Sequence, residues 1–279
     1  MLQRRRRKPS TIDRGPKKTV VFWVFMGVAV ILAGLMFWTI ESREAPASAA
    51  AIYEPARPDP IAPPMSPPTL AQVLDSPDPA FVLVIGDSTG FADYQWVTRF
   101  ANRIGLAYDR PVNVARWNEG TIAYDPPIAV AQGRGAPVTV WNASAPGESP
   151  RYSQTHLKAM TAPVREPALI IINHGHNTGP DPATDISRLV KSVRTQYRMV
   201  PIGLTVQNPY LGQSPENAAQ RAHAVRDWAA RQRNTVVIDV HSAYTASPDI
   251  ASLYQDQRHP NATGGDVWAA TIWSTFELR

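Results

Sequence analysis

The 279-residue chain contains no cysteine. A domain without cysteine has no disulfide framework, so its stability must come from a hydrophobic core. The absence also excludes a thiol nucleophile and any metal site built on thiolate ligands. The chain has no internal repeat either.

Outside the first 18 residues, the chain has no excess of basic side chains. The whole chain carries a formal net charge of +5. Residues 1–18 hold eight basic side chains and one acidic one, which is +7, so the other 261 residues together carry −2. Nucleic-acid binding requires a basic surface on the folded domain. The charge pattern therefore predicts no nucleic-acid partner and assigns the high pI to a short basic arm.

Charged side chains are absent from residues 19–40. A helix of this length rises about 33 Å, enough for the hydrocarbon core of a bilayer. Trp23 and Trp38 lie near its two ends, where indole rings favour the membrane interfaces. The segment predicts a retained transmembrane anchor. A cleaved signal peptide is the alternative, because Ala47-Ser48-Ala49 offers a cleavage pattern, but the apolar run exceeds the ~7–15 residues of a signal core.

The basic arm also predicts the orientation of this anchor. Basic residues precede the span and almost none follow it, which places the N-terminus in the cytoplasm and residues 41–279 outside. Residues 41–79 hold ten of the 27 prolines of the chain. This composition predicts an extended tether, partly polyproline II, that holds residues 80–279 away from the bilayer. One short helix is expected within it, around residues 70–74.

From residue 80 onward, short apolar runs alternate with helical periods. This rhythm predicts a parallel sheet that is covered by helices on both faces. Residues 112–135 depart from it, because turn signals between short alternating runs predict an inserted antiparallel hairpin. The expected strands are Phe81–Ile85, Val138–Trp141, Ala168–Asn173, Pro201–Val206 and Thr235–Val240, and the expected helices are Phe91–Ile104, Ser153–Thr161, Pro182–Tyr197, Pro215–Gln232 and Ala262–Phe276.

Ser88 stands at the junction of the first expected strand and the helix after it. Backbone N–H groups at a helix start can stabilise an oxyanion, and open α/β folds place their sites at the carboxyl edge of the sheet. Gly86-Asp87-Ser88 is also an ordinary turn sequence. As a nucleophile, Ser88 requires a base, a group that orients this base, and oxyanion donors from elsewhere in the chain.

Among the six histidines, His259 alone has a carboxylate at close, loop-compatible spacing, in Asp256. Asp256 can accept a hydrogen bond from one imidazole nitrogen, which leaves the other to take the proton of Ser88. The alternative is a solvated loop in which an aspartate and a histidine occur together by chance.

Two further loops that follow expected strands could supply oxyanion donors. Gly147 can present a backbone N–H, and Asn177 can offer a side-chain N–H group. The first loop could equally be a plain turn. His174 and His176 raise the alternative of a metal site, but no carboxylate or third histidine stands nearby at ligand spacing. We therefore expect neither a metal nor a cofactor.

The order of these residues resembles the SGNH hydrolases, the GDSL-type esterase and lipase superfamily, which is named for a Ser, Gly, Asn and His in four blocks. The matching segments are Gly86-Asp87-Ser88, Asn142 to Gly147, Gly175-His176-Asn177, and Asp256 with His259-Pro260-Asn261. Thr205 to Pro209 also resembles the fourth-strand edge of these enzymes. The departures are Ser144, where a glycine is more usual, and His176, which replaces a commonly variable residue. The resemblance covers residues 80–279.

The resemblance implies a flavodoxin-like three-layer α/β/α fold, with a five-stranded parallel sheet of order 2-1-3-4-5. It also implies an acyl-enzyme mechanism without a metal. Ser88 would attack an ester carbonyl, His259 would take and return the proton, and Asp256 would orient His259. The backbone N–H groups of Ser88 and Gly147 and the side chain of Asn177 would form the oxyanion hole.

Together these features predict a membrane-anchored, extracytoplasmic serine esterase that acts on acyl esters, O-acetyl esters included, of envelope glycans or lipids. An acyltransferase on the same scaffold is the alternative, because the same residues serve when a sugar replaces water as the acceptor. A non-catalytic module that binds envelope polymers or proteins is the third hypothesis. The complete set of Ser, Asp, His and Asn argues against it.

Overall fold

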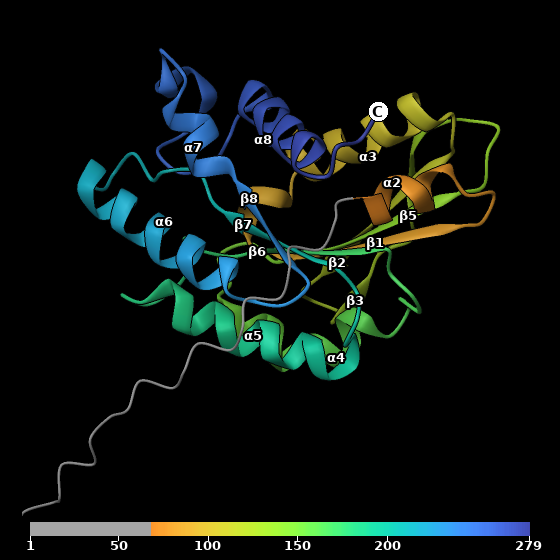
Figure 1. Cartoon of the computed structure of the whole chain (residues 1–279), viewed down its shortest axis with the longest axis horizontal. Coiled ribbons are helices and arrows are strands. Elements are labelled where there is room, and N and C mark those ends of the chain that lie inside the picture. The colour runs from red at the N-terminus through yellow and green to blue at the C-terminus, as the bar shows by residue number, and fades with distance from the viewer. Residues whose placement is uncertain (1–67) are drawn as a thin grey trace, which may run out of the picture. The chain divides into compact units, whose positions relative to one another are not determined.

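The computed structural model describes residues 68–279. The expected basic arm at 1–18, the expected membrane span at 19–40 and most of the expected tether lie outside the described residues. Within residues 68–279, no helix combines the length and the apolar character needed to cross a membrane. The described residues build a central sheet with helices on both faces (Figure 1).

Six parallel strands form the core of this sheet within the described part of the chain, in the order β2-β5-β1-β6-β7-β8. They are β1 (Ala80–Gly86), β2 (Val112–Asn118), β5 (Val138–Ser144), β6 (Leu169–Asn173), β7 (Ile202–Val206) and β8 (Thr235–Asp239). The last five in sheet order, β5-β1-β6-β7-β8, are the five expected strands in the expected 2-1-3-4-5 arrangement. Strand β1 alternates between the two helical layers, with Val82 and Val84 on one side and Leu83 and Ile85 on the other.

The expected five-stranded, purely parallel sheet is too small. Residues 112–135 contain the expected antiparallel pairing, but their first strand also joins the parallel sheet. Strand β2 pairs in parallel with β5, from Val112 opposite Val138 to Arg116 opposite Asn142. The short strands β3 (Ala123–Tyr124) and β4 (Ile128–Ala131) pair antiparallel with β2, so the sheet is mixed. Polar residues alternate with apolar ones in β2 because it lies near the sheet edge, where burial is incomplete.

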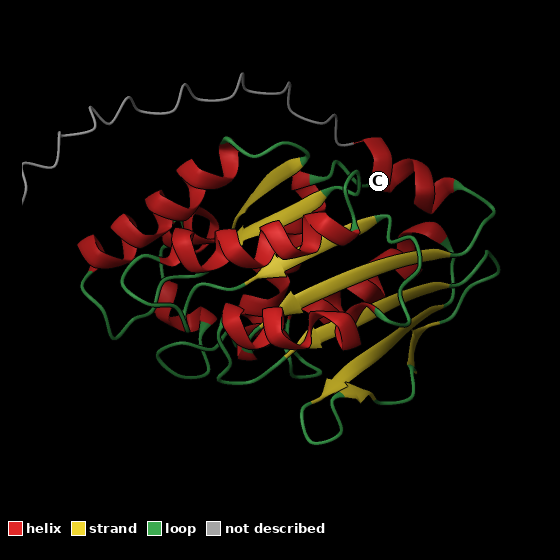
Figure 2. Ribbon diagram, turned by 90° about the horizontal axis from the view of Figure 1, so that it is seen from below, coloured by secondary structure: helices red, strands yellow, loops and turns green. Residues whose placement is uncertain are grey.

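Two groups of helices cover the sheet (Figures 1 and 2). One face carries α3 (Trp96–Tyr108), α7 (Val240–Thr245) and α8 (Ala262–Thr275), and the other carries α4 (Pro150–Thr161), α5 (Pro182–Gln196) and α6 (Pro215–Ala230). The fully buried rings of Trp96 and Trp268 stack with centroids 5.7 Å apart, which packs α3 against α8. Side chains of Asp181, Ser214 and Asn261 accept backbone N–H groups and fix the starts of α5, α6 and α8.

The packed domain begins before residue 80. Helix α2 (Pro68–Asp75) contains the short helix expected around residues 70–74, and it buries Leu70 and Leu74 in the same core layer as α3 and α8. Arg110 is 2% exposed, and its guanidinium group donates to the carbonyl oxygens of Val73 and Leu74 over 3.1 and 3.0 Å. Residues 68–79 therefore belong to the domain and not to an extended tether.

Candidate active site

Ser88 lies at the carboxyl end of β1, in a short 3-10 turn that spans Ser88–Gly90. Asp87 holds this turn, because its Oδ1 accepts the backbone N–H of Thr89 over 3.0 Å and the hydroxyl of Thr89 over 2.7 Å. Beneath the turn, a Cβ atom on Gly86 would lie 2.9 Å from the carbonyl oxygen of Asn173, so only glycine fits at this position. Ser88 is thus presented by a locally fixed turn.

The helix expected from Phe91 begins five residues later, at Trp96. Residues 91–95 form turns, and Gln95 Oε1 accepts the backbone N–H of Ala92 over 2.9 Å. Gln95 itself has extended backbone angles, which sets the first residue of the helix. Phe91 and Tyr94, which contributed to the apolar periodicity of the expected helix, are exposed in this turn.

The structure brings Ser88, His259 and Asp256 together. Ser88 Oγ lies 2.8 Å from His259 Nε2, although the two residues are 171 positions apart. His259 Nδ1 lies 2.8 Å from Asp256 Oδ2. With the Nδ1–H group facing a carboxylate, Nε2 is the nitrogen left to accept the proton of Ser88.

Asp256 also organises the loop that carries His259. Its Oδ1 accepts the backbone N–H groups of Arg258 and His259 over 2.7 and 2.8 Å. Burial opposes ionisation of Asp256, but the hydrogen bonds from His259 and Arg258 outweigh it and lower the pKa of the carboxyl group to about 2. The loop is closed by the antiparallel bridge between Tyr254 and Pro260. Asp256 is therefore an ionised partner for His259 at neutral pH.

Gly147 lies in the loop that follows β5, next to the turn of Ser88. The amide of Asn142, at the end of β5, donates to the carbonyl of Gly90 over 2.8 Å, and this contact is buried. Gly147 has a φ of +77°, a conformation that favours glycine. Ser144, which stands where the resemblance led us to expect glycine, is fully buried beside Gly90. The larger residue is accommodated within the core.

Asn177 links the loop of Gly147 to the loop of His259. Its Nδ2 donates to the carbonyl of Glu148 over 3.2 Å, and its Oδ1 accepts from Arg258 Nη1 over 3.4 Å. The amide carries two N–H donors, of which Glu148 takes one. The second is the group that an oxyanion could use.

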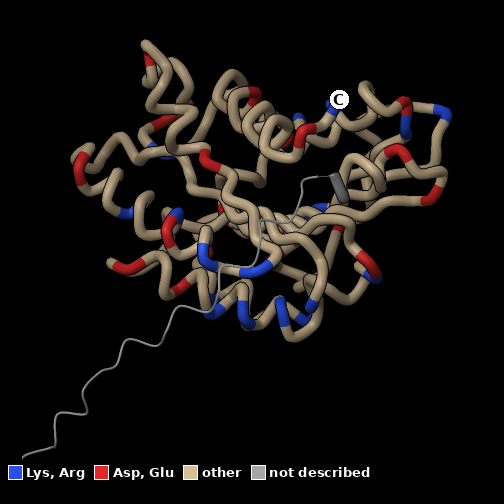
Figure 3. Tube along the Cα trace, viewed as in Figure 1, with Lys and Arg blue, Asp and Glu red and all other residues tan. Residues whose placement is uncertain are grey.

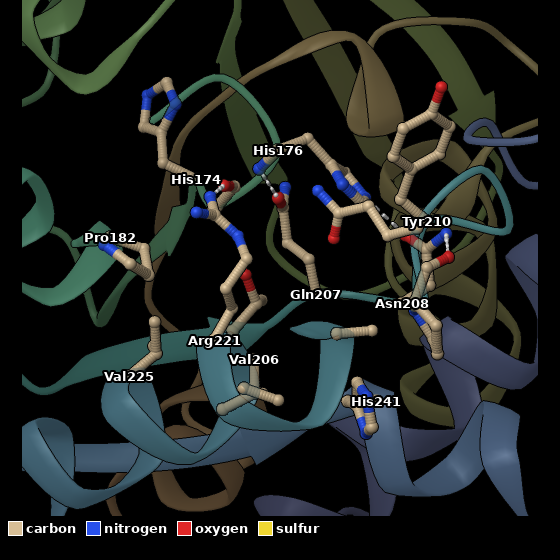
Figure 4. Close-up of a pocket in the computed structure, with 16 residues that line it drawn as sticks. His174, His176, Pro182, Val206, Gln207, Asn208, Tyr210, Arg221, Val225 and His241 are labelled. Atoms are coloured by element: carbon tan, nitrogen blue, oxygen red, sulfur yellow. Dashed lines mark hydrogen bonds between the residues drawn. The ribbon is translucent and has the colours of Figure 1, made fainter. Parts of the chain in front are cut away.

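A buried hydrogen-bond network beneath these loops was not identified from the sequence. Gln207, just after β7, donates to Asp87 Oδ2 and to Asn173 Oδ1 over 3.0 Å each, and its Oε1 accepts the backbone N–H of His176 over 2.7 Å (Figure 4). Asn173 donates in turn to the hydroxyl of Thr89 over 2.9 Å. The available signal was a polar residue at the end of each apolar strand. The network joins the turn of Ser88 to the loop of Asn177.

Arg221 and two histidines hold the loop of Asn177 from the other side. Arg221, on α6, donates to the carbonyl of Gly175 over 3.0 Å and to the hydroxyl of Thr178 over 2.7 Å (Figure 4). Burial lowers the pKa of His174 to about 4, against a smaller opposing effect of the Asp87 charge. Burial lowers the pKa of His176 as well, against the opposing effects of the Asp87 charge and of the hydrogen bond with Asn208. Both histidines are therefore neutral structural groups at physiological pH.

The cavity beside these residues is separate from the proposed triad. It has a volume of about 50 Å³ and is lined by His174, His176, Gln207 and Arg221 among others, but not by Ser88 or His259 (Figure 4). A cavity of this size holds only a few waters. Across residues 68–279, no three His, Asp or Glu side chains gather at metal-binding distances.

Comparison with known proteins yields structural matches but no sequence matches. No protein-family model and no curated protein matches the chain. A two-domain esterase active on acetylated mannans superposes with a TM-score of 0.53 at 16% identity, over 75% of this chain and 52% of that one, so this chain spans about half its length. A carbohydrate esterase of family 3 from Talaromyces cellulolyticus has a TM-score of 0.52 at 17% identity, over 71% and 96% of the two chains.

A lipolytic protein of the G-D-S-L family from Veillonella parvula gives a similar result. The TM-score is 0.51 at 15% identity, and the match covers 71% of this chain and 98% of that one. At these identities the likeness establishes the fold. The chain therefore has the fold of these esterases and lipolytic proteins, as the order of the four sequence blocks predicts.

Proposed function

We propose that this chain, which has the fold of the GDSL-type SGNH hydrolases, is a serine esterase that cleaves acyl esters through an acyl-enzyme. The observation that carries the proposal is the line of contacts from Ser88 to His259 to Asp256, each 2.8 Å long. A nucleophile, a base and a carboxylate that orients the base are the three groups that acyl transfer through serine requires.

The mechanism follows from the position of each group. Ser88 Oγ attacks the ester carbonyl while His259 Nε2 takes its proton, and Asp256 stabilises the imidazolium ion that forms. The negative charge on the carbonyl oxygen is held by the backbone N–H groups of Ser88 and Gly147 and by the second N–H of Asn177. The intermediate collapses when His259 gives its proton to the leaving alcohol. Water, activated by His259, then hydrolyses the acyl-enzyme and releases the acid.

For the substrate, we propose acyl esters, with O-acetyl esters of glycans or lipids of the cell envelope as the first class to test. Two of the structurally similar proteins are described as an esterase active on acetylated mannans and as a carbohydrate esterase, which supports this choice. The envelope location rests on residues 19–40 alone. It is tested by cell fractionation, in which the full chain should stay with the membrane and a variant lacking residues 19–40 should not.

The experiment that tests the activity uses the purified full chain and 4-nitrophenyl esters from acetate to long acyl chains. Ser88→Ala should lose about 10⁴-fold or more in kcat, because the nucleophile is removed. Ser187→Ala is the matched control, since Ser187 lies on α5 and its hydroxyl only donates to the carbonyl of Thr184. Equal turnover by Ser88→Ala and the unmodified chain would overturn the proposal.

A further inference from the structure

Arg258, the residue before His259, places a fixed positive charge at the proposed active site. Its side chain is partly buried. The guanidinium carbon lies 4.7 Å above the centre of the Tyr210 ring, and Nη1 lies 3.4 Å from Asn177 Oδ1. Within residues 68–279, no carboxylate forms an ion pair with this side chain. The charge is held in place but not neutralised.

Several other arginines of the domain make more hydrogen bonds or ion pairs within the protein than Arg258 does. Arg110, Arg194 and Arg221 donate to several backbone carbonyl groups and so hold the fold together. Arg99 and Arg116 form ion pairs with aspartates. Arg258, by contrast, has one long hydrogen bond to a neutral amide and a stacking contact. Four of the five guanidinium N–H donors are thereby left for a ligand.

The backbone of Arg258 is fixed at both ends, so little ordering is needed before a ligand binds. Its N–H donates to Asp256 Oδ1 over 2.7 Å, and its carbonyl accepts from Asn208 Nδ2 over 2.9 Å. The neighbouring residue Gln257 accepts the backbone N–H of Leu211 over 2.9 Å. Such preorganisation reduces the entropic cost of binding.

The position of Arg258 indicates which part of an ester it meets. The leaving oxygen must come within hydrogen-bond reach of His259 Nε2 to receive its proton, so the alcohol part of the ester lies over the loop that carries Arg258. Basic and acidic residues are both spread along residues 68–279 (Figure 3), so the local charge of Arg258, and not a general excess of one sign, acts on this part of the ester. The unpaired guanidinium group attracts a negatively charged alcohol part.

We propose, on the basis of the proposed function, that Arg258 recognises a carboxylate on the alcohol part of the ester, so that the substrate is an acylated hydroxy acid such as an acidic sugar. The planar guanidinium fork matches a carboxylate in bidentate geometry. A single cation suits a monoanion better than a phosphate dianion.

The test uses two chromogenic esters that differ by one carboxylate, 4-nitrophenyl acetate and 3-carboxy-4-nitrophenyl acetate. The measured quantity is the ratio of kcat/KM for the charged ester to that for the neutral ester, with the purified full chain. Arg258→Gln should lower this ratio about 10-fold, the effect of losing one charge-assisted hydrogen-bonded contact. Arg258→Lys should lower the ratio less than Arg258→Gln does, and Arg258→Glu should lower it more. Added salt should lower the ratio of the unmodified chain, because it screens the charge.

Arg231→Gln is the matched control, since it removes the same charge at the opposite edge of the sheet. Arg231 is exposed and lies between the end of α6 and the start of β8, whereas Ser88 follows the carboxyl end of β1. Its ratio should equal that of the unmodified chain. A purely structural role of Arg258, through Asn177, would slow both esters equally and leave the ratio unchanged.

Two results would contradict the account, and they can be told apart. In the first, the unmodified chain, Arg258→Gln and Arg258→Glu all hydrolyse both esters with the same ratio of kcat/KM values. This result would overturn the role assigned to Arg258 but not the esterase proposal. Hydrolysis of neither ester by the unmodified chain would overturn both proposals.

Discussion

Gln207 donates its side-chain N–H to Asp87 Oδ2 over 3.0 Å, and both residues are buried, at 8% and 0% exposure. The same amide accepts the backbone N–H of His176 through its oxygen over 2.7 Å. One side chain therefore connects the turn of Ser88 with the loop of Asn177. These two segments supply the proposed nucleophile and the proposed oxyanion donor, and they are not adjacent in the sequence.

Gln207→Leu should reduce both stability and activity. The substitution keeps the size of the side chain but leaves a buried carboxylate and a buried N–H without this partner, which costs about 1–3 kcal/mol. Urea unfolding measures the stability, and kcat for 4-nitrophenyl acetate measures the effect on the site. Gln232→Leu is the control, because Gln232 donates only to the carbonyl of Trp228 near the end of α6. Equal effects of the two substitutions would contradict the role assigned to Gln207.

Asn177→Ala should lower kcat for ester hydrolysis by about 10²–10³-fold, the usual effect of losing one oxyanion donor. KM should change little, because the donor acts on charge that develops in the transition state. Asn102→Ala is a suitable control, since the amide of Asn102 donates to the carbonyl of Val130 on β4, away from Ser88. A kcat within a few-fold of the unmodified chain would show that Asn177 only holds the loop of Glu148.

The stability effect of Asp256→Asn should depend on pH. The pKa of Asp256 is about 2, below its ordinary value of 3.8, so folding favours the ionised carboxylate. Its contribution is fully present above about pH 4 and disappears as the pH falls through about 2. The Tm difference between the unmodified chain and Asp256→Asn should therefore be largest near neutral pH and shrink in acid. A difference that grows as the pH falls would contradict the assignment.

Leu74→Ala should destabilise the domain by about 2–5 kcal/mol, the usual cost of removing a buried leucine side chain. Leu74, on α2, is 2% exposed and lies in the same core layer as α3 and α8, while Leu106 on α3 is 77% exposed. Leu106→Ala should therefore have almost no effect, and the comparison is made by thermal or urea unfolding. If the two substitutions cost the same, α2 does not belong to the packed domain.

Each expected strand leaves a local signal in the sequence, and so does each proposed site residue. The five expected strands are short apolar runs, and the order of these five in the sheet is confirmed. Ser88, Gly147, Asn177 and the pair Asp256 and His259 each follow such a run or stand in a recognisable loop. The structure places Ser88, His259 and Asp256 within hydrogen-bond distance of one another, and Asn177 in contact with Glu148, the residue after Gly147.

Other features depend on contacts that no local pattern records. Strand β2 joins the sheet through pairing with β5, while its own alternation, which includes Asn113 and Arg116, is equally typical of a hairpin. The Gln207 network joins residues up to 120 positions apart. The sequence does not indicate a role for Arg258, because a charged residue in a loop is usually solvated. Only its contacts with Tyr210 and Asn177 distinguish it from other loop arginines.

The central claim, that Ser88 is a nucleophile activated by His259, is tested most directly by covalent labelling. The full chain is incubated with a fluorophosphonate probe, and the modified residue is mapped by peptide mass spectrometry. The account predicts one label, on Ser88, that is absent in Ser88→Ala and forms much more slowly in His259→Ala. A folded chain that remains unlabelled, or a label that persists in Ser88→Ala, would contradict it.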